Sequence, residues 1–377
     1  MKTPLVEIIP RTKELFLEGL KGRAAFDVRL DGPEELAVCL DIYAFQPQNH
    51  PENHLGWWSF KLGNGDHLLD VDFDFTRIGP DSLKAAAGGQ PVLPAGLWVN
   101  PDYRLGPLQD CRLAGWAGTN LIYLKRFLIK IDDINVLMDF YDRHFKTEGY
   151  APPLPFLDLM HKFKLKKLKG YFERYFRGRV LDVGCGLSLF SEIQPEWNFE
   201  IYAGDFVFGR IKQRKEAVPS IEWLVFDASR LPFRSESFDA LFAGEILEHL
   251  PRPEQAVAEW NRVLKKGGVL VVTTPNKGRR VNRINKENWP FSPDHLREFS
   301  FRELNRELLP GGGFKPVKTK GIYLELWTKS NQWWKEDYLQ REGNSMSNSR
   351  IMKILYRVGY RFPRRALVLM TVARKIR

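Results

Sequence analysis

Cysteine is scarce in this sequence, and the few cysteines are far apart. The 377 residues contain three, Cys39, Cys111 and Cys185, and none of them belongs to a CxxC pair. A disulfide framework or a cysteine-based zinc cluster needs more cysteines or closer spacing, so both are excluded. The sequence therefore predicts a protein of a reducing compartment.

Long apolar runs are also missing. No stretch approaches the roughly 20 apolar residues of a membrane-spanning helix, and the opening MKTPLVEIIPRTKELF lacks the apolar core of a signal peptide. We expect a cytoplasmic protein, either free or peripheral at the inner face of the membrane. Internal repeats are absent as well, which excludes a solenoid.

Acidic residues are in deficit. The chain has 57 Lys and Arg against 46 Asp and Glu, a net charge of +11. Such a charge favours an anionic partner, which leaves nucleic acid, phosphorylated or anionic substrates, and membrane surfaces open. With 44% hydrophobic residues over 377 positions, the chain is long enough for two globular domains.

The first 150 residues predict a β-rich accessory module. Short alternating segments such as AAFDVRL and LLDVDFDF are separated by turn-forming stretches such as GNGDH, as in a small sandwich or barrel. Tryptophans at 57, 58, 98 and 116 would stack on sugar rings if exposed, and would belong to the core if buried. We expect most of these four side chains to be buried in the core. Residues 151–178 are predicted to be a proline-rich linker and a lead-in helix.

Residues 179–377 predict the second domain. Apolar strands alternate with helices there, which indicates an α/β fold with a Rossmann-like, doubly wound and mostly parallel sheet. Ligands of such a sheet bind beyond the carboxyl ends of its strands. An insertion at 331–365 contains a basic amphipathic helix at 349–361, which would contact an anionic membrane surface or cover the substrate cleft as a lid.

A glycine-rich loop ends the first strand of that sheet, in Asp182-Val183-Gly184-Cys185-Gly186. A dinucleotide fingerprint would have a third glycine at 189, where this chain has Leu189. The acid before the first glycine suits a cationic group such as an amino-acid ammonium. The loop therefore favours S-adenosylmethionine (SAM) over NAD.

Two further acids end the next strands. Asp205, 19 residues after Gly186, is placed to accept hydrogen bonds from both ribose hydroxyls. Asp227 is placed to accept a hydrogen bond from the adenine amino group. The predicted cofactor-binding residues are Asp182, Gly184, Cys185, Gly186, Asp205, Phe206, Asp227 and Ala228.

A second group of polar residues follows the fourth strand. Glu245, Glu248 and His249 have the spacing i, i+3, i+4, which on a helix places them on one face, and His295 follows the fifth strand. Methyl transfer to a hydroxyl benefits from a base or from a metal ion. The predicted catalytic residues are His249, Glu245 and His295. Alternatively, two carboxylates and two imidazoles would hold Mg²⁺ or a related divalent ion.

Together these motifs resemble the class I SAM-dependent methyltransferases, of the type 11 and ubiquinone-pathway O-methyltransferase kind, over about 179–314. The pattern E-x-x-E-H with a later histidine is similar to that of ubiquinone-pathway O-methyltransferases and of small-RNA 3′-terminal 2′-O-methyltransferases. That resemblance implies a divalent metal held by Glu245, Glu248, His249 and His295. One departure is Ser188, where many members carry glycine.

The function we expect is O-methylation of a hydroxyl on a sugar, a glycan or a lipid-linked small molecule. A β-module joined to a methyltransferase is similar to accessory modules in glycan biosynthesis. The alternatives are a metal-dependent RNA 2′-O-methyltransferase and a SAM-binding scaffold without turnover. The first segments carry no RNP-like aromatic motif, which disfavours RNA. The sequence predicts no oligomeric state.

Overall fold

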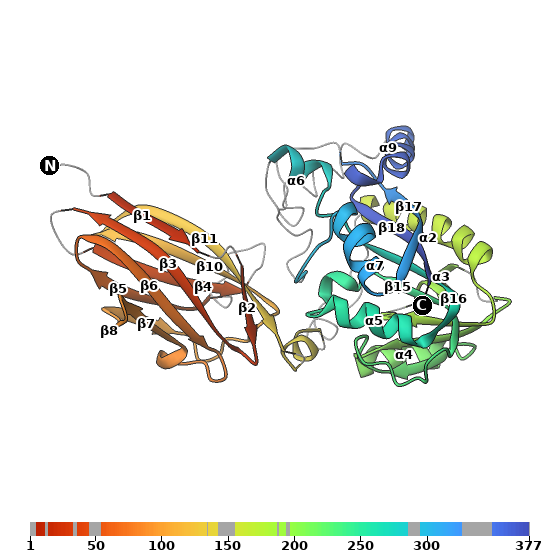
Figure 1. The fold of residues 1–377 in the computed structure, drawn as a ribbon, viewed down its shortest axis with the longest axis horizontal. Helices are drawn as coiled ribbons and strands as arrows, with labels where there is room; N and C mark the ends of the chain where they lie inside the picture. Colours follow the sequence, from red (N-terminus) through yellow and green to blue (C-terminus); the bar gives the residue numbers. More distant parts are fainter. Residues whose placement is uncertain are drawn as a thin grey trace. The chain divides into compact units, whose positions relative to one another are not determined.

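The chain folds into two compact units, 1–140 and 141–377 (Figure 1). The computed structural model describes residues 5–11, 14–32, 36–44, 54–133, 135–141, 155–186, 188–193, 197–285, 295–325 and 349–376. The second unit begins at residue 141, ten residues before 151, where the predicted accessory module ends and the linker begins. The proline-rich linker around 151–154 and most of the predicted insertion at 331–365 lie outside the described residues.

The first unit is built from one long β-sheet. Eleven described strands follow the order β8-β7-β6-β3-β2-β11-β10-β4-β5-β9, and β1 pairs with β3. Their bounds are β1 Leu5–Pro10, β2 Glu14–Glu18, β3 Lys21–Asp31, β4 Leu36–Ala44, β5 His54–Leu62, β6 Gly65–Asp74, β7 Leu83–Ala87, β8 Gln90–Val92, β9 Gly96–Val99, β10 Leu108–Ala117 and β11 Asn120–Asp132.

This sheet folds over its own apolar face. The indole N–H of Trp58 on β5 donates to the carbonyl of Pro80, beyond β6, at 3.3 Å, although β5 and β6 lie far apart in the strand order. Phe26 of β3 meets Phe127 of β11 edge to face, with ring centroids 5.3 Å apart. The core lies between the two halves, as in the predicted sandwich-like module. Trp58 belongs to this core, whereas Trp98 is 43% exposed.

The second unit contains a seven-stranded sheet in the order β14-β13-β12-β15-β16-β18-β17. The first five strands are parallel, and β18 is antiparallel to both of its neighbours. This confirms the predicted doubly wound sheet. The bounds are β12 Arg179–Val183, β13 Glu200–Asp205, β14 Glu222–Val225, β15 Phe238–Gly244, β16 Leu264–Pro275, β17 Phe314–Ile322 and β18 Val368–Lys375.

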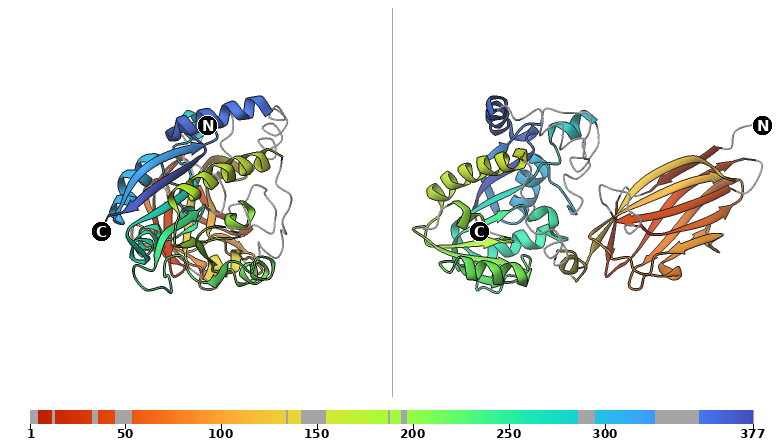
Figure 2. Two further views of the ribbon diagram at one scale, coloured as in Figure 1. Left: turned by 90° about the vertical axis from the view of Figure 1, so that its right-hand side faces the viewer. Right: turned by 180° about the vertical axis from the view of Figure 1, so that it is seen from behind.

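Helices cover both faces of this sheet (Figure 2). Successive strand residues alternate between two apolar cores: Val180 packs with one, and Leu181 with the other, because side chains of a strand point to opposite faces. The first core contains side chains of α2 (Pro155–Tyr175), α3 (Leu189–Ile193), α4 (Phe208–Ala217) and α9 (Ser349–Arg361). The second contains side chains of α5 (Pro253–Val263) and η4 (Glu303–Leu308).

Burial along α5 explains its orientation. Ala256, Val257, Trp260 and Val263 are fully buried, and their spacing of three or four residues places them on one helical face. Pro253 stands at the first turn, where its missing N–H costs no hydrogen bond. Among the described residues, none of the helices is both long enough and apolar enough to cross a bilayer.

Candidate active site

The two glycines of the loop after β12 have left-handed backbones, with φ of +64° at Gly184 and +52° at Gly186. They serve different purposes. A Cβ on Gly184 would lie 1.9 Å from Cδ1 of Ile246, whereas a Cβ on Gly186 would meet nothing within 4 Å. Gly184 is thus required by packing within the protein, and Gly186 leaves open space that a ligand can use.

Asp182 lies behind this loop and is 1% exposed. Its Oδ2 accepts a hydrogen bond from the hydroxyl of Ser188 at 2.8 Å. Burial, with a smaller contribution from Asp205, raises the pKa of the Asp182 carboxyl to about 7. A buried carboxyl of this kind would be stabilised in its charged form by a cationic ligand. Ser188 has φ +55°, a left-handed backbone of the kind that glycine adopts most readily.

Asp205 is fixed by the backbone on both sides. The N–H of Gly186 donates to Oδ2 at 3.0 Å, and the N–H of Val207 donates to Oδ1 at 2.9 Å. Each carboxylate oxygen keeps a further lone pair, so the two oxygens remain able to accept two hydroxyl groups. This arrangement fits the ribose of SAM.

The remaining predicted cofactor residues line the neighbouring strand ends. Cys185 is buried and its backbone N–H donates to the carbonyl of Gly204 at 3.0 Å. Asp227 accepts from the N–H of Ser229 at 2.8 Å. The buried Ala228 accepts at its carbonyl from the indole of Trp260, at 3.0 Å. These bonds fix the loop backbones around the space beside Gly186.

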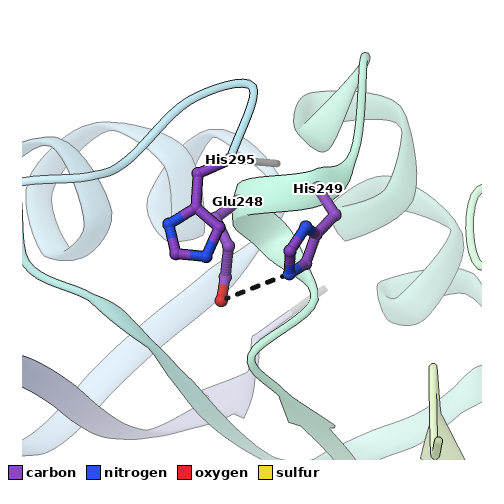
Figure 3. A group of neighbouring side chains, drawn as sticks. All are labelled: Glu248, His249 and His295. Atoms are coloured by element: carbon purple, nitrogen blue, oxygen red, sulfur yellow. Dashed lines mark ion pairs between the residues drawn. The ribbon is translucent and has the colours of Figure 1, made fainter. Parts of the chain in front are cut away.

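A cluster of three side chains lies after β15 and before η4 (Figure 3). Glu248 and His249 belong to the short helix η3 (Leu247–His249), and His295 follows β16 in the chain. One ligand atom from each of these three residues lies within 4.8 Å of the others. The backbone carbonyl of Glu248 also accepts from the N–H of Arg297 at 3.1 Å, which ties His295 and its neighbours to η3.

Glu248 is fully buried. Its Oε2 accepts from the hydroxyl of Thr274 at 2.8 Å. Its Oε1 has no hydrogen-bond partner among the described residues and lies 3.9 Å from Nε2 of His249. Burial, and then the nearby Glu245, raise the pKa of Glu248 to about 8. A buried oxygen without a donor is suited to a cation.

Glu245, the fourth predicted ligand, is not part of this cluster. It has a left-handed backbone with φ +53°, and its Oε1 forms an ion pair with Lys164 of α2 at 3.3 Å. The prediction that Glu245 shares a helical face with Glu248 and His249 is therefore wrong, because the helical turn begins only at Leu247.

Both imidazoles are held at Nδ1. The phenol of Tyr141 lies 2.5 Å from Nδ1 of His249, and Oε1 of Glu298 lies 2.8 Å from Nδ1 of His295. Partners at Nδ1 orient the ring and leave Nε2 to face the reacting group, as in metal sites. Neither partner was predicted from the sequence. Only Glu298, three residues after His295, carries a local signal.

Tyr141, the first residue of the second unit, connects the cofactor edge to the cluster. Its ring meets Phe206 edge to face at 5.8 Å and His249 at 5.6 Å between centroids. Ile246, which packs on Gly184, directly precedes η3. The glycine loop, Phe206 and the cluster therefore form one continuous site at the carboxyl ends of β12, β13 and β15.

Residues 181–272 match the family model described as a methyltransferase domain. This part of the chain is a methyltransferase domain. This match, with a relative described below as SAM-dependent, confirms the expected class and its cofactor, SAM; the sheet also ends in the antiparallel pair β18 and β17.

Curated relatives match the same part of the chain. A demethylmenaquinone methyltransferase of Renibacterium salmoninarum is 40% identical over 94 residues, covering 25% of this chain and 40% of the relative. An uncharacterized chloroplastic methyltransferase of Arabidopsis thaliana is 37% identical over 117 residues, covering 28% and 33%. A "probable S-adenosylmethionine-dependent methyltransferase" of Mycolicibacterium smegmatis is 29% identical over 144 residues, covering 38% and 54%. The matches thus span about a third to a half of each relative and concern the methyltransferase domain.

Proposed function

We propose that the protein is a SAM-dependent O-methyltransferase that acts on a hydroxyl of a sugar, a glycan or a lipid-linked small molecule. The observation that supports it best is the cluster of Glu248, His249 and His295 directly beside the cofactor loop. SAM would supply the methyl group as an electrophile, and the protein would have to bring the acceptor oxygen into line and accept its proton.

His249 is the residue best placed to take that proton. When its Nδ1–H donates to the phenol oxygen of Tyr141, Nε2 carries the lone pair and becomes the basic atom. The imidazolium that forms would be stabilised by Oε1 of Glu248, 3.9 Å from Nε2. Tyr141 is then a positioning residue, since it selects the tautomer.

A divalent cation fits the same three side chains. Glu248, His249 and His295 would hold it through one carboxylate oxygen and two Nε2 atoms. Glu245 would keep its ion pair with Lys164. Two imidazoles favour Zn²⁺, Fe²⁺ or a similar transition metal over Mg²⁺, which prefers oxygen ligands. Such an ion would lower the pKa of an acceptor hydroxyl.

Two observations support the acceptor class. One relative is named for demethylmenaquinone, which supports a small-molecule acceptor and does not bear on whether the methyl group goes to oxygen. Trp98, on the edge strand β9 of the first unit, is exposed and offers an aromatic surface of the kind on which sugar rings stack. The second candidate, an RNA 2′-O-methyltransferase, is favoured by the Glu-His-His cluster and by the net charge of +11.

The test is transfer of labelled methyl from SAM in the presence of a host-cell extract. Lipid, glycan, RNA and protein pools are separated afterwards, with and without chelator. Label in the glycan or lipid pool is the expected result, and chelator-sensitive label in RNA would favour the second candidate. SAM binding without label in any pool would favour the scaffold.

Variants separate the roles of the cluster from folding. His249→Ala and Glu248→Gln are expected to lower turnover by about 100-fold or more while SAM binding is retained. His67→Ala, in the first unit and half-buried, is the matched control and should methylate as the wild type. Wild-type turnover by both cluster variants would refute the proposed chemistry.

A further inference from the structure

Helix α9 has one side fixed against the second unit. Leu355 and Tyr356 are buried, and the ring of Tyr356 stacks on Phe163 of α2 at 4.1 Å between centroids. Gly359 packs so closely on Tyr323 that a Cβ would lie 2.6 Å from its backbone. These contacts determine which residues of α9 face outward.

The outward side is cationic and also apolar. Lys353, Arg357 and Arg361 repeat every four residues and are exposed, so they form a row along the helix. Ile354 lies beside this row and is 57% exposed, as is Phe362 just after the helix. Ile354 is thus turned outward although its neighbour Leu355 is buried.

In the part of the chain that the structure describes, no acidic side chain pairs with this row. None of the residues from 343 to 377 is acidic, and within the described residues no ion pair joins Lys353, Arg357 or Arg361 to a carboxylate. By contrast, Lys169 of α2 pairs with Glu173, and Arg302 pairs with Glu307.

Neighbouring elements extend the positive charge. Lys167 of α2 and Lys320 of β17 each lie 4.8 Å from the ring centroid of Tyr360, which borders the row on α9. Figures 1 and 2 show α9 along the same side of the second unit as α2. The surface therefore unites five cations from three elements: Lys167, Lys320, Lys353, Arg357 and Arg361.

We propose that this surface, which we call the α9 face, docks the protein on an anionic lipid bilayer. Lysine and arginine attract anionic headgroups, and exposed Ile354 and Phe362 would insert at the boundary between headgroups and acyl chains. Nucleic acid would use the cations but would gain nothing from the exposed Ile354. Docking is independent of the methyl-transfer chemistry, so its failure would leave the proposed function intact.

The test is sedimentation of the full chain with vesicles of phosphatidylcholine, alone or with about one third phosphatidylglycerol. The wild type is expected to bind the anionic vesicles at about 0.1 M salt and to be released at about 0.5 M. Each cation contributes about five-fold in partitioning, so K353Q/R357Q/R361Q should bind about 100-fold more weakly. K212Q/K215Q/K266Q removes the same charge from exposed positions elsewhere in the second unit and should bind as the wild type, apart from a small loss of general attraction.

A second variant tests insertion. Ile354→Ser with Phe362→Ser is expected to weaken binding about ten-fold while its salt dependence is unchanged. These positions are exposed, so the melting temperature should stay at the wild-type value. Absence of binding to anionic vesicles, or equal losses in the α9 and control charge variants, would overturn the proposal. Binding of RNA alone, weakened by the α9 substitutions, would assign the surface to nucleic acid instead.

Discussion

Replacing Gly184 by alanine tests the packing of the glycine loop against Ile246, the residue before η3. A non-glycine residue at φ +64° costs about 1–2 kcal/mol. The added Cβ would also lie 1.9 Å from Cδ1 of Ile246, and relief of such overpacking costs about 1–3 kcal/mol. We expect the second unit to lose roughly 2–5 kcal/mol of stability, or on the order of 10 °C in melting temperature for a unit of this size.

Gly186→Ala is the matched control. Its φ of +52° imposes the same backbone cost of about 1–2 kcal/mol, but no atom lies within 4 Å of the added methyl group. Its main effect should be on SAM, whose affinity we expect to fall about ten-fold or more because the methyl enters the open space.

The assay is calorimetric unfolding, which separates the transitions of two units, together with titration of SAM. Ile246→Val removes the Cδ1 atom that clashes with the new Cβ. In that background, Gly184→Ala should cost about 1–2 kcal/mol less than in the wild type. Equal destabilisation by Gly184→Ala and Gly186→Ala, without coupling to Ile246, would refute the packing argument.

Four further predictions concern buried or half-buried polar groups. The Asp182 carboxyl, with its pKa near 7, must lose its proton to pair with the ammonium of SAM. The affinity for SAM should therefore rise with pH up to about 7, and this pH dependence should disappear in Asp182→Asn. Calorimetric titration in buffers of different ionisation enthalpy measures both the affinity and the released proton. The same raised pKa means that the ligand-free protein should lose stability as pH rises from about 4 to about 7, since the unfolded state releases this proton first. Arg279→Met would remove the 2.5 Å ion pair with the buried Glu325, at about 3–5 kcal/mol; adding Glu325→Leu should recover part of this loss in urea unfolding. Tyr141→Phe should lower kcat about ten-fold and shift its pH profile without changing the Kd of SAM, and an unchanged profile would contradict the positioning role.

The glycine loop and the acids beside it were predictable because their signals are local. A short apolar strand, an acid and two glycines specify a tight turn at residues 182–186, and the acids of the next strands meet at the same edge of a parallel sheet. Trp58 and Trp98 show where such reasoning stops: the first is buried and the second exposed, and only the folding of the sheet on itself distinguishes them.

The cluster of Glu248, His249 and His295 was predicted only in part. His295 joins Glu248 and His249, as expected from its position after the fifth strand. Glu245 does not, because a periodicity argument assumes a helix that in fact starts two residues later, at Leu247. Tyr141 precedes His249 by 108 residues, and no pattern along the sequence relates the two.

The most direct test of the proposed O-methylation is the bonding of the transferred methyl group. SAM with a ¹³C-labelled methyl would be incubated with the protein and the pool that accepts label, and the carbon shift of the product would be read by NMR. A methyl bonded to oxygen, lost in His249→Ala while SAM binding persists, is the predicted result. A methyl on carbon or nitrogen would contradict it.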